Sequence, residues 1–353
     1  MKPINYAIVG VGGYGIQRRK KLRQAGCFQM LGGLDITPTA LDQAEEEEGH
    51  PLRRYQNLSE LVTDPEVEAV VVSTPAHLHV EQAFEAARAG KAIFVEKPLG
   101  HNLEECRALV EYCEAREIPH GHGFSSRFDP IFVHAKKMID DGMLGKLVGV
   151  AASQMSTLGL VFPKDNWRFH PERNPGGPLF QCGIHKIDLL RFLIGEGQWL
   201  SGVLDRHLTD SETEDSLILI GLFGGVPVTF HSHYVASYRH GMEFYGTHGT
   251  LLISEYPTRI EFKETDWEGK PEPLQNIIDL VKPVEAEGDA LRDFARAVRE
   301  RRQPLINGRD GLRAVELVHQ AVEVATAINQ PKAGANQPCN VVPLPDSRVP
   351  ALA

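Results

Sequence analysis

Near its amino terminus the chain reads Ile4-Asn5-Tyr6-Ala7-Ile8-Val9-Gly10-Val11-Gly12-Gly13-Tyr14-Gly15, and this stretch decides the fold. The apolar run 4–9 predicts one buried strand, and three glycines follow it at the spacing of a dinucleotide-binding turn. In such a turn the first glycine permits the tight bend, the second lets a pyrophosphate approach, and the third lets helix and strand pack closely. Residues 14–25 predict a helix whose first N–H groups would face the phosphates. We expect the cofactor to be bound by Gly10, Gly12, Gly13, Tyr14 and Gly15, although such a loop can also serve only as a turn.

Asp35 ends a second apolar segment, Met30–Leu34. It lies about twenty residues beyond the turn, where a dinucleotide fold places a carboxylate on the adenosine ribose. A carboxylate accepts hydrogen bonds from ribose hydroxyls but repels a 2′-phosphate, and Ile36 and Thr37 follow it rather than an arginine. The sequence therefore favours NAD over NADP. Because of the basic run Arg18–Lys21, NADP stays possible as the less favoured cofactor. The competing interpretation of Asp35 is an exposed aspartate at the start of a helix.

Two further strands and a helix extend the pattern. Residues 66–73 and 92–95 read as buried strands, and residues 79–89 as a helix that Gly90 ends. Strands that alternate with helices predict a parallel, doubly wound α/β sheet, in which ligands bind at the carboxyl ends of the strands. The residues expected at that edge, close to the cofactor, are Thr74, Pro75, His77, His79, Glu96 and Lys97.

After residue 120 the pattern changes to longer strands. A helix is predicted over 130–141 and a strand over 147–153, and Gly224-Gly225 marks a hairpin. Further strands are predicted over 216–223, 226–234, 242–245 and 250–254, and helices over 288–301 and 309–328. We therefore divide the chain into a Rossmann-type dinucleotide-binding domain (1–122), an α+β domain with a large, mostly antiparallel sheet (123–331), and an extended tail (332–353).

Composition disfavours several classes of partner. The net charge of −10 argues against nucleic acid, and no apolar run is long enough to span a membrane. The chain enters its first strand at once, which predicts no signal peptide. Five cysteines stand without metal-ligand spacing, as expected of reduced thiols in a cytoplasmic protein. The pairs His120–His122 and His231–His233 lack a nearby third ligand, so no metal site is predicted.

Four segments resemble one known family, the glucose–fructose oxidoreductase/inositol dehydrogenase (Gfo/Idh/MocA) oxidoreductases. They are Ala7–Gly12, Ser73–His79 with Ala89–Lys91, Val95–Leu99, and Gly176–Leu179 with Gly183–Asp188. Weaker similarities lie at 127–130, 246–250 and 308–312, so the resemblance covers nearly the whole chain. It implies a Rossmann domain followed by an α/β domain whose open sheet shields the nicotinamide. That sheet often forms oligomer contacts, so a homodimer or homotetramer is expected.

The resemblance also implies a reaction, the NAD(P)-dependent oxidation of a CH–OH group on a sugar, inositol or related polyol. Lys97 matches the family's lysine and His185 its catalytic histidine. Oxidising a secondary alcohol removes a proton from oxygen while hydride leaves carbon. A histidine suits the proton because its pKa lies near working pH, and the compact charge of a lysine suits the developing alkoxide. The Lys97–Pro98 bond is expected to be cis, as in the family.

One position departs from the family's pattern. Many members carry an aspartate four residues before the histidine, where this chain has Gln181. An amide cannot titrate, but it donates and accepts hydrogen bonds, so Gln181 would position a sugar hydroxyl. Asp188, three residues after His185, would contact the substrate, support the imidazole or simply pair with Arg191.

Further residues are expected around the substrate. Trp167 and Arg168 precede the catalytic segment, where an aromatic face and a guanidinium would grip a sugar ring, although both could be structural. Arg127 and His170 are additional candidates. The predicted substrate-binding set is Lys97, Arg127, Trp167, Arg168, Gln181, His185 and Asp188.

Three functions stay open at this point. The first is an NAD-dependent dehydrogenase of a sugar, inositol or polyol, with Lys97 and His185 at the reacting hydroxyl. The second is a member of the family that retains NAD and oxidises a sugar transiently, for glycoside cleavage or isomerisation. The third is a non-catalytic dinucleotide-binding sensor, with Gln181 as the sign of lost activity. The presence of both Lys97 and His185 favours an enzyme.

Overall fold

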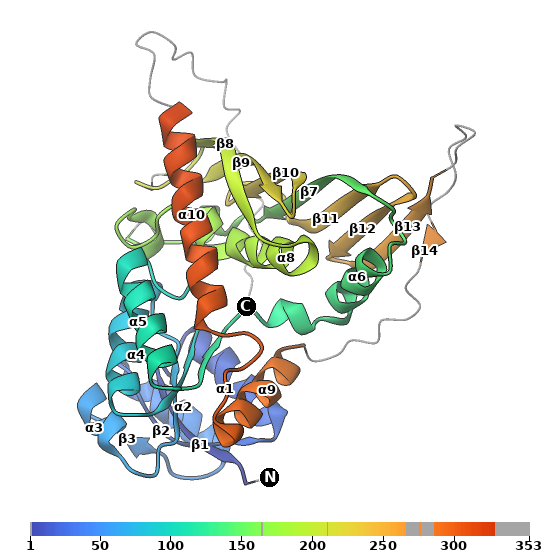
Figure 1. Cartoon of the computed structure of the whole chain (residues 1–353). Coiled ribbons are helices and arrows are strands. Elements are labelled where there is room, and N and C mark those ends of the chain that lie inside the picture. Colours follow the sequence, from blue (N-terminus) through green and yellow to red (C-terminus); the bar gives the residue numbers. More distant parts are fainter. Residues whose placement is uncertain (1, 164, 210, 266–274, 277–285, 329–353) are drawn as a thin grey trace.

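The computed structural model describes residues 2–163, 165–209, 211–265, 275–276 and 286–328, and its strands form two sheets (Figure 1). The first sheet has six strands in the order β3-β2-β1-β4-β5-β6, and every neighbouring pair is parallel. Its strands are β1 (Ile4–Val9), β2 (Phe28–Leu34), β3 (Arg53–Arg54), β4 (Ala69–Val72), β5 (Ala92–Val95) and β6 (His120–His122). This is the doubly wound α/β sheet that the sequence predicts.

Helices connect these strands and cover both faces of the sheet. They are α1 (Tyr14–Ala25), α2 (Pro38–Glu48), α3 (Leu58–Thr63), the short η1 (Ala76–Leu78), α4 (His79–Arg88) and α5 (Leu103–Ala115). Every residue of β4 and β5 is buried, as the central strands of a parallel sheet between two helical layers require. Local signals set the helix ends: Asn102 caps α5 by accepting from the Glu104 and Glu105 N–H groups, and α1 ends at Gly26 in a left-handed conformation.

The second sheet has eight strands in the order β14-β13-β12-β11-β7-β10-β9-β8. The central pair β7 and β10 is parallel, and the other pairs of described strands are antiparallel. The strands are β7 (Leu147–Met155), β8 (Gly197–Asp205), β9 (Ser216–Phe223), β10 (Val226–His233), β11 (Arg239–Gly246), β12 (Gly249–Glu255), β13 (Thr258–Glu264) and β14 (Gln275–Asn276). The prediction of a large, mostly antiparallel second sheet is therefore confirmed.

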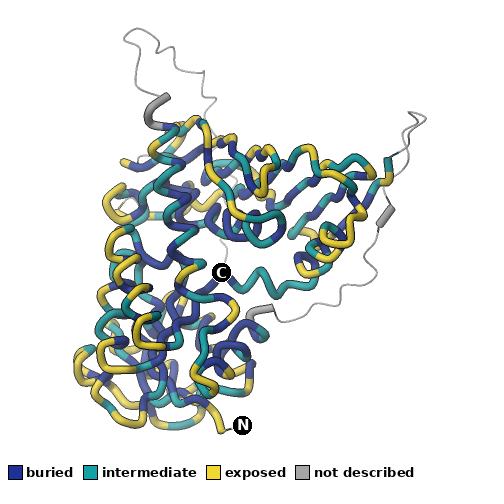
Figure 2. Tube along the Cα trace, in the orientation of Figure 1, coloured by how far each residue is buried: buried dark blue, intermediate teal, exposed yellow. Residues whose placement is uncertain are grey.

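The described helices cover one face of this second sheet and leave the other, the open face, uncovered (Figure 1). α6 (Pro130–Asp140) and α8 (Ile184–Ile194) lie on the face towards the first domain (Figure 1). Burial alternates along β9: Leu217 and Leu219 are buried, whereas Ile218 and Ile220 are 42% and 50% exposed (Figure 2). The remaining short elements are η2 (Ser125–Phe128), α7 (Leu158–Val161), η3 (Trp167–Phe169) and η4 (Leu179–Gly183).

The last two described helices tie the domains together. α9 (Ala286–Glu300) packs on α1, and the Phe294 ring lies 6.3 Å from that of Phe28 and 5.4 Å from that of Phe94. α10 (Gly308–Ile328) packs along both α5 and β8. The domain boundary at residue 122 stays a prediction, and the predicted tail 332–353 lies outside the described residues. No helix in the described part of the chain has the length and apolar character to cross a bilayer.

Candidate active site

The glycine-rich turn joins β1 to α1 at the carboxyl edge of the parallel sheet. Gly10 has a φ of 86°, and a Cβ there would lie 2.8 Å from the carbonyl carbon of Ser73. A Cβ at Gly15 would lie 2.0 Å from the carbonyl oxygen of Gly10. Helix α1, described over its whole length, has no side-chain cap and no acidic residue in its first turn. Its positive end is therefore available to an anion, and the turn fits a pyrophosphate.

Asp35 lies beside this turn, immediately after β2. Its carboxylate accepts the N–H of Gly12 at 2.9 Å and the N–H of Thr37 at 2.8 Å. These two bonds fix the carboxylate at the end of the turn, where the ribose of a dinucleotide would lie. The next side chain, Ile36, is fully exposed and places no positive charge near a 2′-position.

Lys97 follows β5 on the same edge, and the Lys97–Pro98 peptide is cis, which confirms the expectation. The Nζ atom donates to the main-chain oxygen of Gln181 at 3.0 Å, so this bond joins the first domain to η4. Burial lowers the pKa of Lys97 from its ordinary value. The preceding residue, Glu96, is buried and paired with Arg18. This arginine of the basic run 18–21 therefore binds a carboxylate of the protein itself rather than a cofactor phosphate.

His185 is the second residue of α8, which continues directly from η4. The Nδ1 atom of His185 is buried and has no hydrogen-bond partner among the described residues. Burial, followed by the charge of Lys97, holds the pKa of His185 well below its ordinary value. The imidazole is therefore neutral near pH 7 and is able to accept a proton.

A cavity of about 90 Å³ opens at this edge of the sheet. Its lining residues are Tyr14, Ser73, Thr74, Ala76, His79, Glu96, Lys97, Pro98, Trp167, Arg168 and Gln181. The structure thus brings the end of the glycine turn, the carboxyl ends of β4 and β5, and η3 and η4 of the second domain to one place. His77 lies beside the same cavity, with its ring 5.7 Å from that of Trp167.

His79 joins two of the loops that form this edge. Its ring is buried between the carbonyl oxygen of Pro98, 2.7 Å from Nδ1, and that of Thr74, 2.6 Å from Nε2. Both ring nitrogens are therefore occupied by the main chain. His79 holds the ends of β4 and β5 together.

Arg127 and Asp188 lie apart from the cavity lining. Arg127 binds Asp188 through two nitrogens and binds Asp310 at 2.8 Å. Arg191 lies 3.7 Å from both carboxylates, so the group connects η2, α8 and the first turn of α10. Burial raises the pKa of Asp188 to about 6, against the opposing effect of Arg127. In this network Asp188 accepts two hydrogen bonds from Arg127, and Arg127 also donates to Asp310.

Two other polar residues of this region, Asn174 and Tyr234, are not predicted from the sequence. The Asn174 side chain donates to the carbonyl oxygen of Arg168 at 2.6 Å and accepts from the Gln181 amide at 3.2 Å. The Tyr234 hydroxyl is buried beside Arg168, with the Asn174 amide nearby, and it makes no regular hydrogen bond within the described part of the chain. Neither residue belongs to a recognisable motif, and only the fold brings them to η3 and η4.

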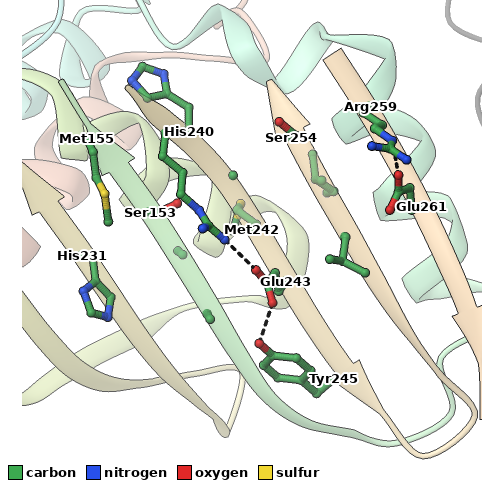
Figure 3. Close-up of a pocket in the computed structure, with 16 residues that line it drawn as sticks. Ser153, Met155, His231, His240, Met242, Glu243, Tyr245, Ser254, Arg259 and Glu261 are labelled. Atoms are coloured by element: carbon green, nitrogen blue, oxygen red, sulfur yellow. Dashed lines mark hydrogen bonds and ion pairs between the residues drawn. The ribbon is translucent and has the colours of Figure 1, made fainter. Parts of the chain in front are cut away.

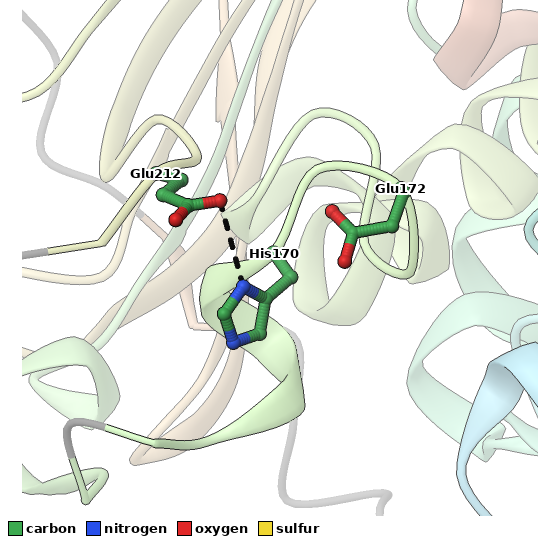
Figure 4. A group of neighbouring side chains, drawn as sticks. All are labelled: His170, Glu172 and Glu212. Atoms are coloured by element: carbon green, nitrogen blue, oxygen red, sulfur yellow. Dashed lines mark ion pairs between the residues drawn. The ribbon is translucent and has the colours of Figure 1, made fainter.

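One surface group has the composition of a metal site. His170, Glu172 and Glu212 place one ligand atom each within 4.8 Å of one another, and His170 lies 3.5 Å from Glu212 (Figure 4). Both glutamates are exposed. Solvated carboxylates beside a histidine are common without a metal ion. This group is therefore no reason to replace the prediction that the chain has no metal site.

A larger hollow, of about 540 Å³, lies on the open face of the second sheet (Figure 3). It is lined by side chains such as Ser153, His231, Arg239, Glu243 and Tyr245. Strand alternation places it on the face opposite α8 and His185. It therefore has no access to the reacting residues, in spite of its size.

The fold and the site define a two-domain, dinucleotide-binding protein with a lysine at the edge of its Rossmann sheet and a histidine on helix α8 of the second domain. Known proteins agree with this description. Residues 4–122 match the "Oxidoreductase family, NAD-binding Rossmann fold" of GFO/IDH/MocA proteins, and residues 132–252 match the "GFO/IDH/MocA C-terminal domain". The chain belongs to the Gfo/Idh/MocA oxidoreductase family.

Individual relatives are distant but extend over most of the chain. The inositol 2-dehydrogenase of Rhizobium meliloti (strain 1021) is 26% identical over 328 residues, which is 90% of this chain and 96% of that protein. The scyllo-inositol 2-dehydrogenase (NAD(+)) of Bacillus subtilis (strain 168) is 28% identical over 71% of this chain and 73% of its own length. Among solved structures, a levoglucosan dehydrogenase in complex with NADH superposes with a TM-score of 0.82. It covers 92% of this chain and 98% of its own at 21% identity, which bears on the fold alone.

Proposed function

We propose that this protein is an NAD-dependent dehydrogenase that oxidises a secondary alcohol of a sugar, inositol or related polyol. The observation that carries the proposal is the position of Lys97 in the cavity beside the glycine turn, close enough to the neutral His185 for its charge to lower the pKa of that imidazole. The two inositol dehydrogenases named above support the substrate class.

His185 acts as the general base in this proposal. Its neutral imidazole takes the proton of the reacting hydroxyl, and its depressed pKa keeps it unprotonated before the reaction. Lys97 holds the hydroxyl oxygen and stabilises the negative charge that develops there. A bound nicotinamide would accept the hydride that leaves the same carbon. Trp167, Arg168 and Gln181 line the cavity and bind the rest of the substrate.

Asp35 selects the cofactor in this proposal. Its carboxylate is already oriented by two main-chain N–H groups and has lone pairs left for the ribose hydroxyls. A 2′-phosphate would meet this negative charge, with the uncharged Ile36 as the next side chain. NAD is therefore preferred, and NADP is the weaker cofactor.

Arg127 and Asp188 position the catalytic helix rather than the substrate. Asp188 lies one turn from His185 on α8, and its pairing with Arg127 fixes the rotation of that helix. A homodimer or homotetramer formed through the open face of the second sheet completes the proposal. The exposed Ile218 and Ile220 on that face are the kind of surface that a second copy would cover.

The test is NADH formation, followed by absorbance, with a panel of sugars, inositols and sugar acids and with NAD and NADP separately. Wild type is compared with Lys97→Ala and His185→Ala, and we expect turnover with NAD that both substitutions abolish. A panel without turnover, together with NAD that copurifies and does not exchange, would instead favour the enzyme that retains its cofactor. Equal turnover by the His185→Ala variant would remove the assigned base.

A further inference from the structure

The cavity contains more positive than negative charge. Lys97 and Arg168 both line it, and Glu96 is the acidic residue in the lining. The Glu96 carboxylate is paired with Arg18. Over the described residues, neither Lys97 nor Arg168 has a carboxylate within ion-pair distance, and Arg168 is close enough to Lys97 to lower its pKa. Burial lowers the pKa of Lys97 and Glu96 raises it, but Arg18 pairs with the same carboxylate, so the cavity keeps a net positive charge.

Arg168 is held in place but has few hydrogen bonds. Its guanidinium lies 4.3 Å from the ring centre of Trp167 and 5.1 Å from that of Phe162. The one side-chain hydrogen bond that it makes within the described residues runs from Nη1 to the Asn166 oxygen at 3.5 Å, the limit of such a bond. A guanidinium carries five N–H donors, so most of the fork is left for a ligand. Arg127 is the contrast, because its Nε and Nη2 atoms donate to the carboxylates of Asp188 and Asp310.

The neighbouring polar groups are neutral. Gln181 offers an amide, which also binds Asn174. Burial raises the pKa of Tyr234 well above its ordinary value, so it remains a hydroxyl, and this hydroxyl lacks a regular hydrogen-bond partner in the described part of the chain. His185 is neutral as well. Nothing in this set offsets the two cations, and Tyr234 adds a donor beside them.

We propose that the substrate is an anionic sugar, a sugar acid whose carboxylate pairs with Arg168 while its reacting hydroxyl faces Lys97 and His185. This inference rests on the proposed function and narrows its substrate class. A carboxylate matches the planar fork of arginine through two parallel hydrogen bonds. It also supplies a counter-charge, which favours the charged form of Lys97. A sugar phosphate shares this chemistry in part, and the experiment separates the two.

The experiment measures kcat and KM for matched pairs: glucose with glucuronate, galactose with galacturonate, and glucose with glucose 6-phosphate. We expect kcat/KM for a sugar acid to exceed that of its neutral partner by roughly 10- to 100-fold, mainly through KM, because a charge-assisted bidentate pair is lost in the neutral sugar. In Arg168→Gln the ratio of kcat/KM for the sugar acid to kcat/KM for the neutral sugar should fall towards one. In Arg168→Lys the ratio should lie between those of wild type and Arg168→Gln. A preference for the phosphate over both acids would overturn the carboxylate assignment.

Two further variants make the result specific. Arg116→Gln removes an arginine that is stacked on Tyr112 at 3.8 Å but exposed on the first domain, so it should keep the wild-type ratio. Gln181→Glu adds a carboxylate of the same shape beside the cations and should lower the ratio, even if Arg168→Gln does not fold. Neutral sugars used as well as their acids, or an unchanged ratio in both Arg168→Gln and Gln181→Glu, would overturn the inference.

The inference and the proposed function fail in different ways. Turnover of neutral sugars alone would support the dehydrogenase function and contradict the assignment of a sugar acid as the substrate. If no sugar is turned over, calorimetric binding of glucuronate and glucose in the presence of NADH replaces the kinetic ratio. Tighter binding of glucuronate that Arg168→Gln abolishes would support the anion site without the reaction, and equal binding would overturn it.

Discussion

The proton-accepting residue of the site is tuned by its surroundings. Burial lowers the pKa of His185, and the charges of Lys97, Lys186, His122 and His240 lower it further, so this pKa stays well below 6.5. A base must be neutral to accept a proton, so activity is retained until the pH falls through this depressed pKa. We predict that kcat/KM for alcohol oxidation is still on its plateau at pH 6.5 and declines only below it. An acidic limb centred at or above pH 6.5 would contradict this, and His185→Gln should lower the rate by on the order of 10²–10⁴.

Asp35 gives a second prediction, on the cofactor. Replacing it with asparagine removes the negative charge but keeps an acceptor for the Gly12 N–H group. Hydrogen bonds to a charged group contribute about 1.5–3 kcal/mol, so we expect roughly 10- to 100-fold weaker NADH binding. NADPH should be discriminated against less strongly. Fluorescence titration of both cofactors measures this, with Asp42→Asn, an exposed carboxylate on α2, as the control that should bind as wild type does. Unchanged NADH affinity in Asp35→Asn would place the ribose elsewhere.

At the scale of elements, the network of Arg127, Asp188 and Asp310 holds η2, α8 and α10 together. Asp188 is 1% exposed, so without Arg127 its buried carboxylate loses two hydrogen bonds and keeps Arg191 at 3.7 Å. We predict that Arg127→Met destabilises the fold by about 3–5 kcal/mol, and that the double variant Arg127→Met/Asp188→Leu recovers part of this loss. Urea unfolding measures both. If the Arg127→Met variant keeps wild-type stability but raises KM, Arg127 contacts the substrate instead, as the sequence predicts.

The same network shows where sequence reasoning ends. The glycine spacing and the short apolar runs predict the Rossmann sheet, because each of these sequence patterns lies within a single turn or strand. The strands β8 and β13 are not predicted from the sequence. In β8 apolar residues stand side by side, as in Trp199-Leu200, whereas β13 does alternate, with Ile260 and Phe262 between charged residues. The pairing of Arg127 with Asp188 joins residues 61 positions apart, and a local pattern cannot report it. A local pattern also cannot show that Arg168 on η3 lies near Lys97. Nor can it show that Arg127 is paired with Asp188 and Asp310.

At the scale of the whole molecule, the two sheets have different relations to solvent. Helices cover both faces of the parallel sheet, whereas the described helices cover one face of the second sheet, the one towards the cofactor edge (Figure 1). The open face carries apolar residues on β9 and a charged group around Arg239 and Glu243. A long sheet face of this kind is uncommon on a monomer. The candidate active site and the open face therefore lie on opposite sides of the second sheet (Figure 1).

The open face supplies the last prediction. If a second copy covers it, a charge introduced at Ile220 would be buried without a partner, at a cost of several kcal/mol for each subunit. We expect Ile220→Lys to convert a dimer or tetramer into a smaller species in sedimentation experiments, while far-ultraviolet circular dichroism stays unchanged. Val133→Lys is the matched control, because this residue is also half exposed but lies on α6, on the other side of the sheet. Its oligomer should persist. An Ile220→Lys variant that keeps the wild-type mass would show that the subunits associate elsewhere, or that the sheet face meets a different partner.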